Sequence, residues 1–257
     1  MNGGVIGRRN VPGVDGTSGV WSLQEIADAE RKIVWPPDPH FANVVALLHM
    51  DGAGGSNAFV DEKGHAFTAF GGAQIDTAQS KFGGASALFD GAGDYLSSPD
   101  SVDWDFGTAD FTIEFFIRFN AFPASSAHTV VGNYGSDTVG WLIQFRNDSP
   151  GARLAFGSSG DTPIGEFAWS PSTATWYHVA VARASGTVRA FVDGSQIGSD
   201  VTNVEDISGS TAPLMVGRIN AAAGQYINGW LDDLRITKGI ARYTAGFSPP
   251  AKAFPSI

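Results

Sequence analysis

The sequence predicts an all-β domain, built as a sandwich or a barrel. Short apolar runs alternate with turn signals roughly every 8–12 residues, and no long helical pattern interrupts them. Glycine accounts for 33 of 257 residues, well above the usual ~7%, and charged residues for only 16%, against a typical ~25%. With 18 Phe and 7 Trp, the chain has enough large apolar side chains to fill one sizeable core.

The first 40 residues are predicted to be an N-terminal docking arm with one short helix at about 22–33. Ser22 and Glu25 form an S-x-x-E capping box, and Pro36 ends the helix because proline cannot continue the hydrogen-bond ladder. A helix this short is marginal alone in water, so its apolar residues need a surface, either another subunit or the following domain. We assign these residues to assembly: Trp21, Leu23, Ile26, Ile33 and Trp35.

Residues 41–257 are predicted to form one β domain. Its strongest strand is 111–119, in which every second residue is large and hydrophobic. Burial of each such side chain contributes roughly 1.5–3 kcal/mol, so this strand is expected at the centre of the core. Its inward face is predicted to hold Phe111, Ile113, Phe115, Ile117 and Phe119. The other expected strands lie at 44–48, 85–89, 94–96, 141–145, 153–156, 176–181, 188–192, 214–217 and 230–236.

The last expected strand follows the Asn-Gly turn signal at 228–229. Simple alternation places Trp230, Asp232, Leu234 and Ile236 on one face, so Asp232 shares its face with core residues. A carboxylate in that position must be hydrogen-bonded, paired or bound to a cation, since leaving it bare costs roughly several kcal/mol. We therefore expect a polar partner for Asp232.

The charge balance and the composition exclude several classes of function. The formal net charge is −10 and no basic cluster is longer than Arg8-Arg9, so a nucleic-acid partner is not expected. No apolar run approaches about 18 residues and the N-terminus lacks a signal-peptide core, so we expect no membrane insertion. The chain has no cysteine, which excludes disulfides and favours folding in a reducing cytoplasm.

Six motifs, in this order, make the chain similar to the laminin-G-like jelly rolls of the concanavalin A-like lectin/glucanase group. They are Leu-His-Met-Asp-Gly at 48–52, Lys-Phe-Gly-Gly-Ala-Ser at 81–86, Phe-Asp-Gly-Ala-Gly-Asp-Tyr-Leu at 89–96, Asp-Phe-Thr-Ile-Glu-Phe at 110–115, Trp-Tyr-His-Val-Ala at 176–180 and Phe-Val-Asp-Gly at 191–194. The closing strand, Gly-x-Leu-Asp-Asp-Leu-Arg-Ile at 229–236, fits the same family. The resemblance implies a two-sheet antiparallel jelly-roll sandwich.

The end of the chain indicates which version of this domain the chain resembles. Ile-Thr-Lys-Gly-x-Ala-Arg-Tyr-Thr at 236–244, followed by Phe-x-Pro-Pro at 247–250, resembles the version of this domain found in tailed-bacteriophage virion proteins. This likeness implies a virion location, with assembly in the host cytoplasm.

We predict no catalytic residues. Glucanases of the group that the chain resembles use an E-x-D-x-x-E strand, which brings two glutamates to the sugar bond. Here Glu114 stands alone on its strand, and the only close pair, Glu25 and Glu30, has the wrong spacing. There is no G-x-S-x-G motif, and His178 is expected to be an ordinary strand histidine.

Calcium is the one candidate cofactor, because the laminin-G-like domains that the chain resembles often bind one Ca²⁺ at the sandwich rim through oxygen ligands. Asp94 is the first candidate ligand, followed by Asp90, Asp110, Asp232 and Asp233. The alternative is that these aspartates cap turns by accepting backbone N–H bonds, which the lack of true ligand spacing favours.

Glycan binding is expected from analogy of fold, and it needs aromatic platforms with polar neighbours. Tyr134, Trp141 and Trp169 lie in the polar, glycine-rich middle of the chain and are the candidate platforms. The alternative for each is packing in the core, where most tryptophans of a sandwich lie.

The leading hypothesis is a non-enzymatic virion surface protein, either a head decoration, a fibre or a tail adhesin. Its arm would bind other virion proteins, its jelly roll would bind host or environmental glycans, and the protein would form a homo-oligomer. The alternative is a free-standing carbohydrate-binding or glycan-hydrolysing protein of the same superfamily. A purely structural cement protein without a ligand is the third hypothesis.

Overall fold

The computed structural model describes residues 38–122, 127–135, 139–148, 151–159, 162–218 and 225–257. It also describes the backbone of two strands nearer the N-terminus, β1 (Val5–Arg8) and β2 (Ser18–Trp21), which pair antiparallel. The predicted helix at 22–33 lies outside the described residues, as do Leu23, Ile26, Ile33 and Trp35 and the side chain of Trp21. The division into an arm and a domain therefore stays a prediction.

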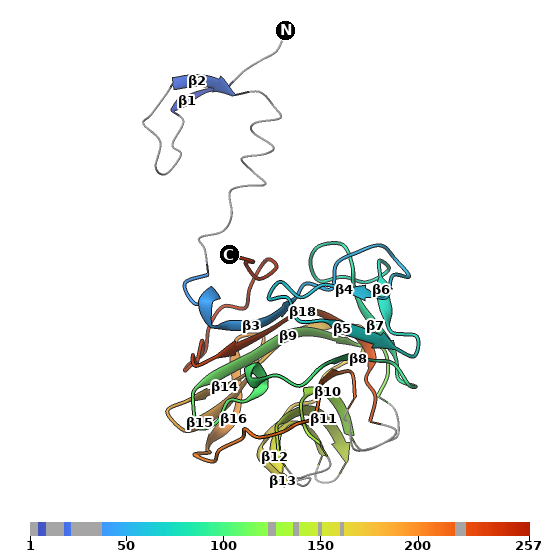
Figure 1. Cartoon of the computed structure of the whole chain (residues 1–257), viewed down its shortest axis with the longest axis vertical. Coiled ribbons are helices and arrows are strands. Elements are labelled where there is room, and N and C mark those ends of the chain that lie inside the picture. Colours follow the sequence, from blue (N-terminus) through green and yellow to red (C-terminus); the bar gives the residue numbers. More distant parts are fainter. Residues whose placement is uncertain are drawn as a thin grey trace.

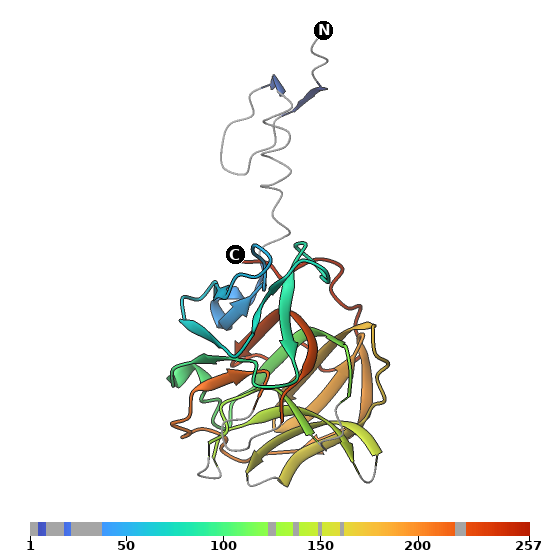
Figure 2. The ribbon, with the colours of Figure 1, turned by 90° about the vertical axis from the view of Figure 1, so that its right-hand side faces the viewer.

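Two antiparallel sheets pack face to face as a sandwich (Figures 1 and 2), which confirms the predicted all-β jelly-roll class. Sheet I has the strand order β13-β12-β11-β10-β17-β8-β5-β4, and sheet II the order β16-β15-β14-β9-β18-β7-β6, with β3 also beside β18. The helices in the described part are two 3-10 turns, η1 (Phe41–Asn43) and η2 (Val102–Trp104). Neither these nor any other described helix could cross a bilayer.

The strands of sheet I are β4 (Ala58–Phe59), β5 (Phe67–Phe70), β8 (Tyr95–Ser98), β10 (Ala127–Gly132), β11 (Leu142–Asp148), β12 (Gly151–Ser159), β13 (Thr162–Ala168) and β17 (Leu214–Val216). Those of sheet II are β3 (Val44–Leu48), β6 (Gln74–Asp76), β7 (Ser86–Asp90), β9 (Phe111–Phe119), β14 (Trp176–Ala184), β15 (Thr187–Val192), β16 (Ser195–Thr202) and β18 (Asn228–Lys238).

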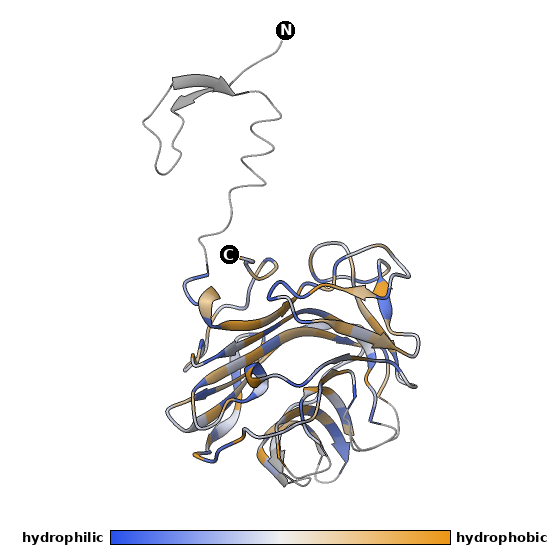
Figure 3. Cartoon of the chain, viewed as in Figure 1, coloured by the Kyte–Doolittle hydropathy of each residue, from blue (hydrophilic) through white to orange (hydrophobic). Residues whose placement is uncertain are grey.

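The main core lies between the two sheets, and Figure 3 shows hydrophobic residues concentrated along their strands. The alternation in β9 is confirmed, because all five predicted inward residues, from Phe111 to Phe119, belong to this core. Sheet I contributes its own aromatic layer to the core: Phe145, Phe156 and Phe167. The other face of β9 points away from the core and carries Glu114 and Phe116.

β18 departs from simple alternation in its middle. Its pairing with β9 shifts between Asp232 and Arg235, where β18 holds one residue more than the facing part of β9. Such an extra residue is a β-bulge, and Asp233 accommodates it with a positive φ of 51°. Beyond a bulge, the residues that face inward change places with those that face outward.

The bulge corrects the predicted position of Asp232. Leu231, rather than Asp232, joins the main core with Leu234. Asp232 is nevertheless buried, with 1% of its surface exposed, and its Oδ2 accepts the backbone N–H groups of Lys81 at 2.7 Å and Phe82 at 3.0 Å. The expected polar partner of Asp232 is therefore the backbone of residues 81–82.

The bulge also lies at the point along β18 where one neighbouring strand ends and another begins. β7 pairs with 228–231 and β3 with 234–237, so a break in strand pairing falls between them on this edge. The carboxylates of Asp232 and Asp233 lie at this break and accept hydrogen bonds there. Oδ2 of Asp233 accepts the N–H of Phe254 at 2.6 Å, and its Oδ1 contacts Nδ1 of His49 at 2.5 Å. Burial raises the pKa of Asp232 to about 7, against the opposing effect of its two N–H donors.

The C-terminal tail, residues 240–257, covers a buried charge network on the outer face of sheet II. Oε1 of Glu114 accepts Nε of Arg235 at 3.0 Å and its Nη2 at 2.7 Å. Oε2 of Glu114 accepts the hydroxyl of Tyr243 at 2.8 Å and lies 3.1 Å from Nε2 of His178. Burial alone would raise the pKa of Glu114, but the Arg235 charge and the His178 contact outweigh it and lower this pKa to about 2.

Asp38 connects the same network to the first described residues of the domain. Its carboxylate accepts both terminal nitrogens of Arg242, at 2.9 and 2.7 Å, and Nη1 of Arg235 at 3.0 Å. Its backbone N–H donates to the carbonyl of Ile257 at 2.8 Å, and Figure 1 shows the C-terminal end close to η1. The tail and the start of the domain are thus held together at one pole.

Candidate functional site

Aromatic residues gather on part of the outer face of sheet I. β5 and β8 pair so that Phe70 lies opposite Tyr95, and their rings stack with centroids 4.6 Å apart and planes 6° apart. Both side chains point away from the core because their neighbours Ala69 and Leu96 point into it. Phe70 is 40% exposed, which is unusual for a large apolar ring.

Arg218 and Tyr226 complete this group, and we name Phe70, Tyr95, Arg218 and Tyr226 the aromatic ledge. The guanidinium carbon of Arg218 lies 4.6 Å from the ring centroid of Tyr95 and 5.6 Å from that of Tyr226. Arg218 follows β17, which flanks β8 on the side opposite to β5. Phe70 and Arg218 therefore approach Tyr95 from opposite sides, and the ledge combines an exposed ring, a phenol and a cation.

Two glycine-rich turns hold the ledge, one after β5 and one before β8. Asp94, in the second turn, is buried, and its two oxygens accept the backbone N–H groups of Gly72 at 2.5 Å and Asp90 at 2.9 Å. Burial raises the pKa of Asp94, and these two hydrogen bonds partly oppose the shift. A Cβ at Gly71, whose φ is 67°, would collide with the carbonyl of Gly93, so the two turns interlock.

Polar side chains continue across the same face. Nε2 of Gln144 donates to Oγ1 of Thr129 at 3.0 Å and to Oε1 of Gln225 at 2.8 Å. On the next strands, Arg153 pairs with the exposed Glu166, their atoms Nε and Oε1 lying 2.6 Å apart. The outer face of sheet I thus carries both polar side chains, on β10 to β13, and an exposed aromatic ring, on β5.

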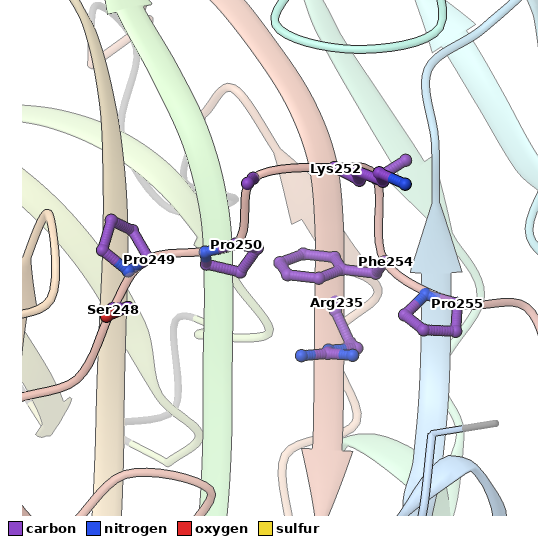
Figure 4. Close-up of a pocket in the computed structure, with 9 residues that line it drawn as sticks. Arg235, Ser248, Pro249, Pro250, Lys252, Phe254 and Pro255 are labelled. Atoms are coloured by element: carbon purple, nitrogen blue, oxygen red, sulfur yellow. The ribbon is translucent and has the colours of Figure 1, made fainter. Parts of the chain in front are cut away.

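A cavity of about 410 Å³ lies on the other side of the sandwich, between the tail and sheet II (Figure 4). It is lined by Arg235 and residues 248–255, and the ring of Phe254 lies 3.9 Å from the guanidinium carbon of Arg235. Arg235 is already paired with Glu114 and Asp38, and most of the other lining groups are proline and alanine. We therefore interpret this cavity as part of the packing of the tail.

The structure corrects one of the predicted glycan platforms. Trp141 is fully buried, with 0% of its surface exposed, and its Nε1 donates to the carbonyl of Trp104 at 2.8 Å, so its ring presents no face to a sugar. Trp169 is half-buried and packs edge-on against Phe145, with centroids 5.8 Å apart. Tyr134 is half-buried in the loop after β10.

The five aspartates considered for calcium all accept backbone N–H groups. Besides those already described, Asp90 accepts the N–H of Ala92 at 2.7 Å, and Asp110 that of Ser185 at 2.7 Å. Within the described ranges, no group of three or more acidic or histidine side chains converges on a point that could hold a metal. These hydrogen bonds agree with the alternative in which the aspartates accept backbone N–H groups, and calcium binding stays a prediction.

Sequence reasoning missed Phe70, Tyr95 and Arg218. Phe70 and Arg218 each lie next to a glycine of a turn, and Tyr95 lies two residues after one, which is the one local signal that could have singled them out. Their proximity depends on the order β17-β8-β5 in sheet I, and that order joins segments far apart in the chain.

The model of one protein family matches residues 90–240, more than half of the chain, and this family is the concanavalin A-like lectin/glucanases superfamily. The chain belongs to this superfamily. The predicted family is thereby confirmed, whereas the bacteriophage setting stays a prediction. No curated protein sequence matches this superfamily member.

Solved structures share the fold of this superfamily member at low sequence identity. Domain 4 of AbnA, a GH43 extracellular arabinanase from Geobacillus stearothermophilus in complex with arabinotriose, has a TM-score of 0.59 and 18% identity, over 77% of this chain and 94% of that domain. The binding domain of Paraclostridial Mosquitocidal Protein 1 has a TM-score of 0.61 and 15% identity, over 78% of this chain and 50% of its own. The binding domain of botulinum neurotoxin serotype G has a TM-score of 0.52 and 14% identity, over 77% and 48%. The chain thus spans about half the length of these two toxin domains, and all three likenesses show the fold alone.

Proposed function

We propose that this superfamily member is a non-enzymatic surface protein of a bacteriophage virion whose jelly roll binds glycans through the outer face of sheet I. The observation that carries glycan binding is the aromatic ledge, where the exposed ring of Phe70 lies beside the phenol of Tyr95. A sugar ring has an apolar face edged with hydroxyls, so it needs an aromatic surface with polar groups alongside.

The similar structures support a binding role by analogy of fold. The arabinanase domain was solved with arabinotriose, and the two toxin structures are binding domains. The domain of AbnA is matched over nearly its whole length, so the likeness in fold extends over that whole domain.

Glycan binding is tested by screening the full chain against immobilised oligosaccharides, alone and with Phe70→Ala. Removing the exposed ring is expected to weaken binding about fivefold or more, because its buried area on stacking is worth about 1 kcal/mol. Phe41→Ala is the matched control, since Phe41 is a half-buried ring in η1, outside sheet I. Absence of glycan binding, or an equal effect of both substitutions, would contradict the proposal.

The virion location is tested by immunogold electron microscopy of intact phage particles, with antibody against residues 41–257. Label over the head supports a decoration protein, and label at the tail tip or fibres supports an adhesin. Deleting residues 1–37 is expected to abolish attachment to the particle while the domain stays folded, because this deletion keeps Asp38 and its ion pairs with Arg235 and Arg242. The absence of label on any particle would contradict the proposed virion location, while membership of the superfamily would be unaffected.

The hydrolase alternative is disfavoured by the surroundings of Glu114. A glycosidase acid needs a raised pKa and access to the sugar. Glu114 is fully buried, and its pKa is lowered to about 2 by Arg235 and His178. A hydrolase activity of the wild type that Glu114→Gln abolishes in a folded protein would revive this alternative.

A further inference from the structure

We propose that a second ligand site lies on the outer face of sheet II, where Arg118 and two tryptophans bind the carboxylate and the ring of an acidic sugar. This inference goes beyond the proposed function, because it concerns the other sheet and does not depend on the aromatic ledge. Its starting point is that Arg118 has no hydrogen bond or ion pair with any other residue in the described part of the chain.

Arg118 lies in the middle of a row of residues that crosses three neighbouring strands. Its backbone lies opposite Trp176 of β14 on one side and Trp230 of β18 on the other. Residues that lie directly opposite each other point to the same face of a sheet, and the neighbours Ile117 and Phe119 point into the main core. Arg118, Trp176 and Trp230 therefore point outward, and we name these three residues the tryptophan row.

The tryptophan row lies at the border of the surface that the C-terminal tail covers. The ring of Phe254, in the tail, lies 6.0 Å from that of Phe116 in the preceding row, and Trp176 packs partly against this cluster. On the other side of the tryptophan row, Asn120 is exposed. The three residues of the row are half-buried, so part of each side chain is accessible to a ligand.

An aromatic ring, and no carboxylate, holds the guanidinium of Arg118. Its Cζ lies 5.5 Å from the ring centroid of Trp230, and its Nε is covered without a hydrogen-bond acceptor. By contrast, a carboxylate lies within 3.2 Å of each of Arg146, Arg153 and Arg189. A guanidinium that rests on a ring keeps its N–H edge for hydrogen bonds, and its planar fork matches the two oxygens of a carboxylate.

The position of the row favours a sugar over a peptide in an extended conformation. β14, β9 and β18 are inner strands of sheet II, so their backbone groups are already paired and cannot bind a further strand. A ligand on this face must therefore be recognised by side chains.

The side chains of the row match an acidic sugar. Nε1 of Trp230 donates to Oδ2 of Asp76 at 2.7 Å, which fixes this indole beside the guanidinium. Adjacent strands lie about 4.8 Å apart, so a single sugar residue spans the distance from either indole to Arg118. Its apolar face would pack on an indole while its carboxylate binds the guanidinium.

The test measures the affinity of the full chain for two matched pairs of oligosaccharides, with and without Phe70→Ala, which removes the exposed ring of the ledge. One pair is a galactose-terminated oligosaccharide with and without a terminal sialic acid, and the other is an oligomer of glucuronic acid beside the equivalent glucose oligomer. A hexamer of glutamate is the peptide probe.

The variants are Arg118→Gln, which removes the charge, and Arg118→Lys, which keeps the charge without the fork. Arg189→Gln is the control, because it makes the same change of charge on sheet II, at an arginine that pairs with the exposed Asp200. The melting temperature of each variant is measured alongside, and Arg118→Gln should leave it unchanged because it breaks no hydrogen bond of the described chain.

We expect the acidic member of at least one pair to bind tenfold or more tightly than the neutral member, both with and without Phe70→Ala. Arg118→Gln should remove this preference, Arg118→Lys should keep part of it, and Arg189→Gln should leave it unchanged. Binding of the acidic member should also change the tryptophan fluorescence, and Arg118→Gln should abolish this change.

Four outcomes would overturn the inference: equal affinities within both pairs, an acidic preference that survives Arg118→Gln, one that Phe70→Ala abolishes, or Arg118-dependent binding of the glutamate hexamer alone. Each of them leaves the proposed function to be judged by neutral glycan binding and its dependence on Phe70, which the same titrations measure. Absence of neutral binding together with an Arg118-dependent acidic preference would instead contradict the ledge and support the second site.

Discussion

Replacing Glu114 with alanine is expected to destabilise the domain by about 3–5 kcal/mol, the usual cost of removing one partner from a buried ion pair. The side chain is fully buried and accepts two hydrogen bonds from Arg235 and one from Tyr243. Without it, Arg235 keeps its ion pair with Asp38 and its contact with the ring of Phe254, and the hydroxyl of Tyr243 loses its acceptor. The variant thus leaves a partly compensated charge beneath the tail.

The pKa of Glu114 provides an independent magnitude. It is lowered from 4.5 to about 2, and at about 1.4 kcal/mol for each pH unit this corresponds to about 3 kcal/mol. Because the folded pKa is lowered, the contribution is complete above pH 4.5 and is lost as the pH falls towards 2. Glu114→Gln should therefore lack the acid-dependent loss of stability that the wild type shows in this window.

Urea unfolding at pH 7, followed by tryptophan fluorescence, measures the effect on the free energy of unfolding. The melting temperature should fall in parallel, by roughly 2–4 °C for each kcal/mol. Glu166→Ala is the matched control, since Glu166 is also a strand glutamate paired with an arginine but is exposed. Such surface pairs contribute about 0–1 kcal/mol. If Glu114→Ala costs no more than this control, the buried network does not stabilise the fold as argued.

Three further outcomes are expected. Asp232→Asn should raise the free energy of unfolding at pH 8 by up to about 4 kcal/mol and have little effect near pH 4. The reason is that the folded pKa of Asp232 is raised to about 7, so the folded wild type loses stability as the pH rises through this range and the carboxyl group ionises. Equal effects at both pH values in urea unfolding would contradict this. Gly194→Ala should lower the free energy of unfolding by at least about 1 kcal/mol, since Gly194 has a φ of 77° and its added Cβ would collide with the carbonyl of Phe247. Limited proteolysis should then cleave the tail faster than in the wild type, and unchanged cleavage would argue against this contact. Trp141→Phe should cost about 1–3 kcal/mol by leaving the buried carbonyl of Trp104 without its donor, and a calorimetric melting curve equal to that of the wild type would refute this.

Patterns of period two predicted those parts of the fold that are long strands with one buried face. β9 is the clearest case, because a 9-residue strand repeats its alternation often enough to exclude a helix. β5 was not predicted, since four residues with two phenylalanines carry too little periodicity to be recognised. β18 was predicted as a strand, but the bulge at Asp233 was not, and it moved Leu231 into the core in place of Asp232.

The candidate site could be predicted less well than the fold, and the aromatic residues show why. Trp141 and Phe70 both lie near glycines in polar surroundings, and nothing local distinguishes the buried ring from the exposed one. Exposure depends on which strand lies alongside and on which loop crosses above, and both are set by contacts between distant segments. The partners of the carboxylates could not be predicted either, because the local sequence around a buried aspartate does not distinguish a bound cation from a backbone N–H donor.

The sequence by itself determined the all-β class, the superfamily, the inward face of β9 and the need of Asp232 for a polar partner. Each of these depends on side-chain chemistry and spacing within a few residues, where the backbone period leaves little freedom. Only the tertiary structure decided that Glu114 is an internal ion-pair partner, that Asp232 binds the chain at 81–82, and that Phe70, Tyr95 and Arg218 form one ledge. These pairings join segments far apart in the chain, and strand order and a one-residue bulge, rather than local pattern, bring them together.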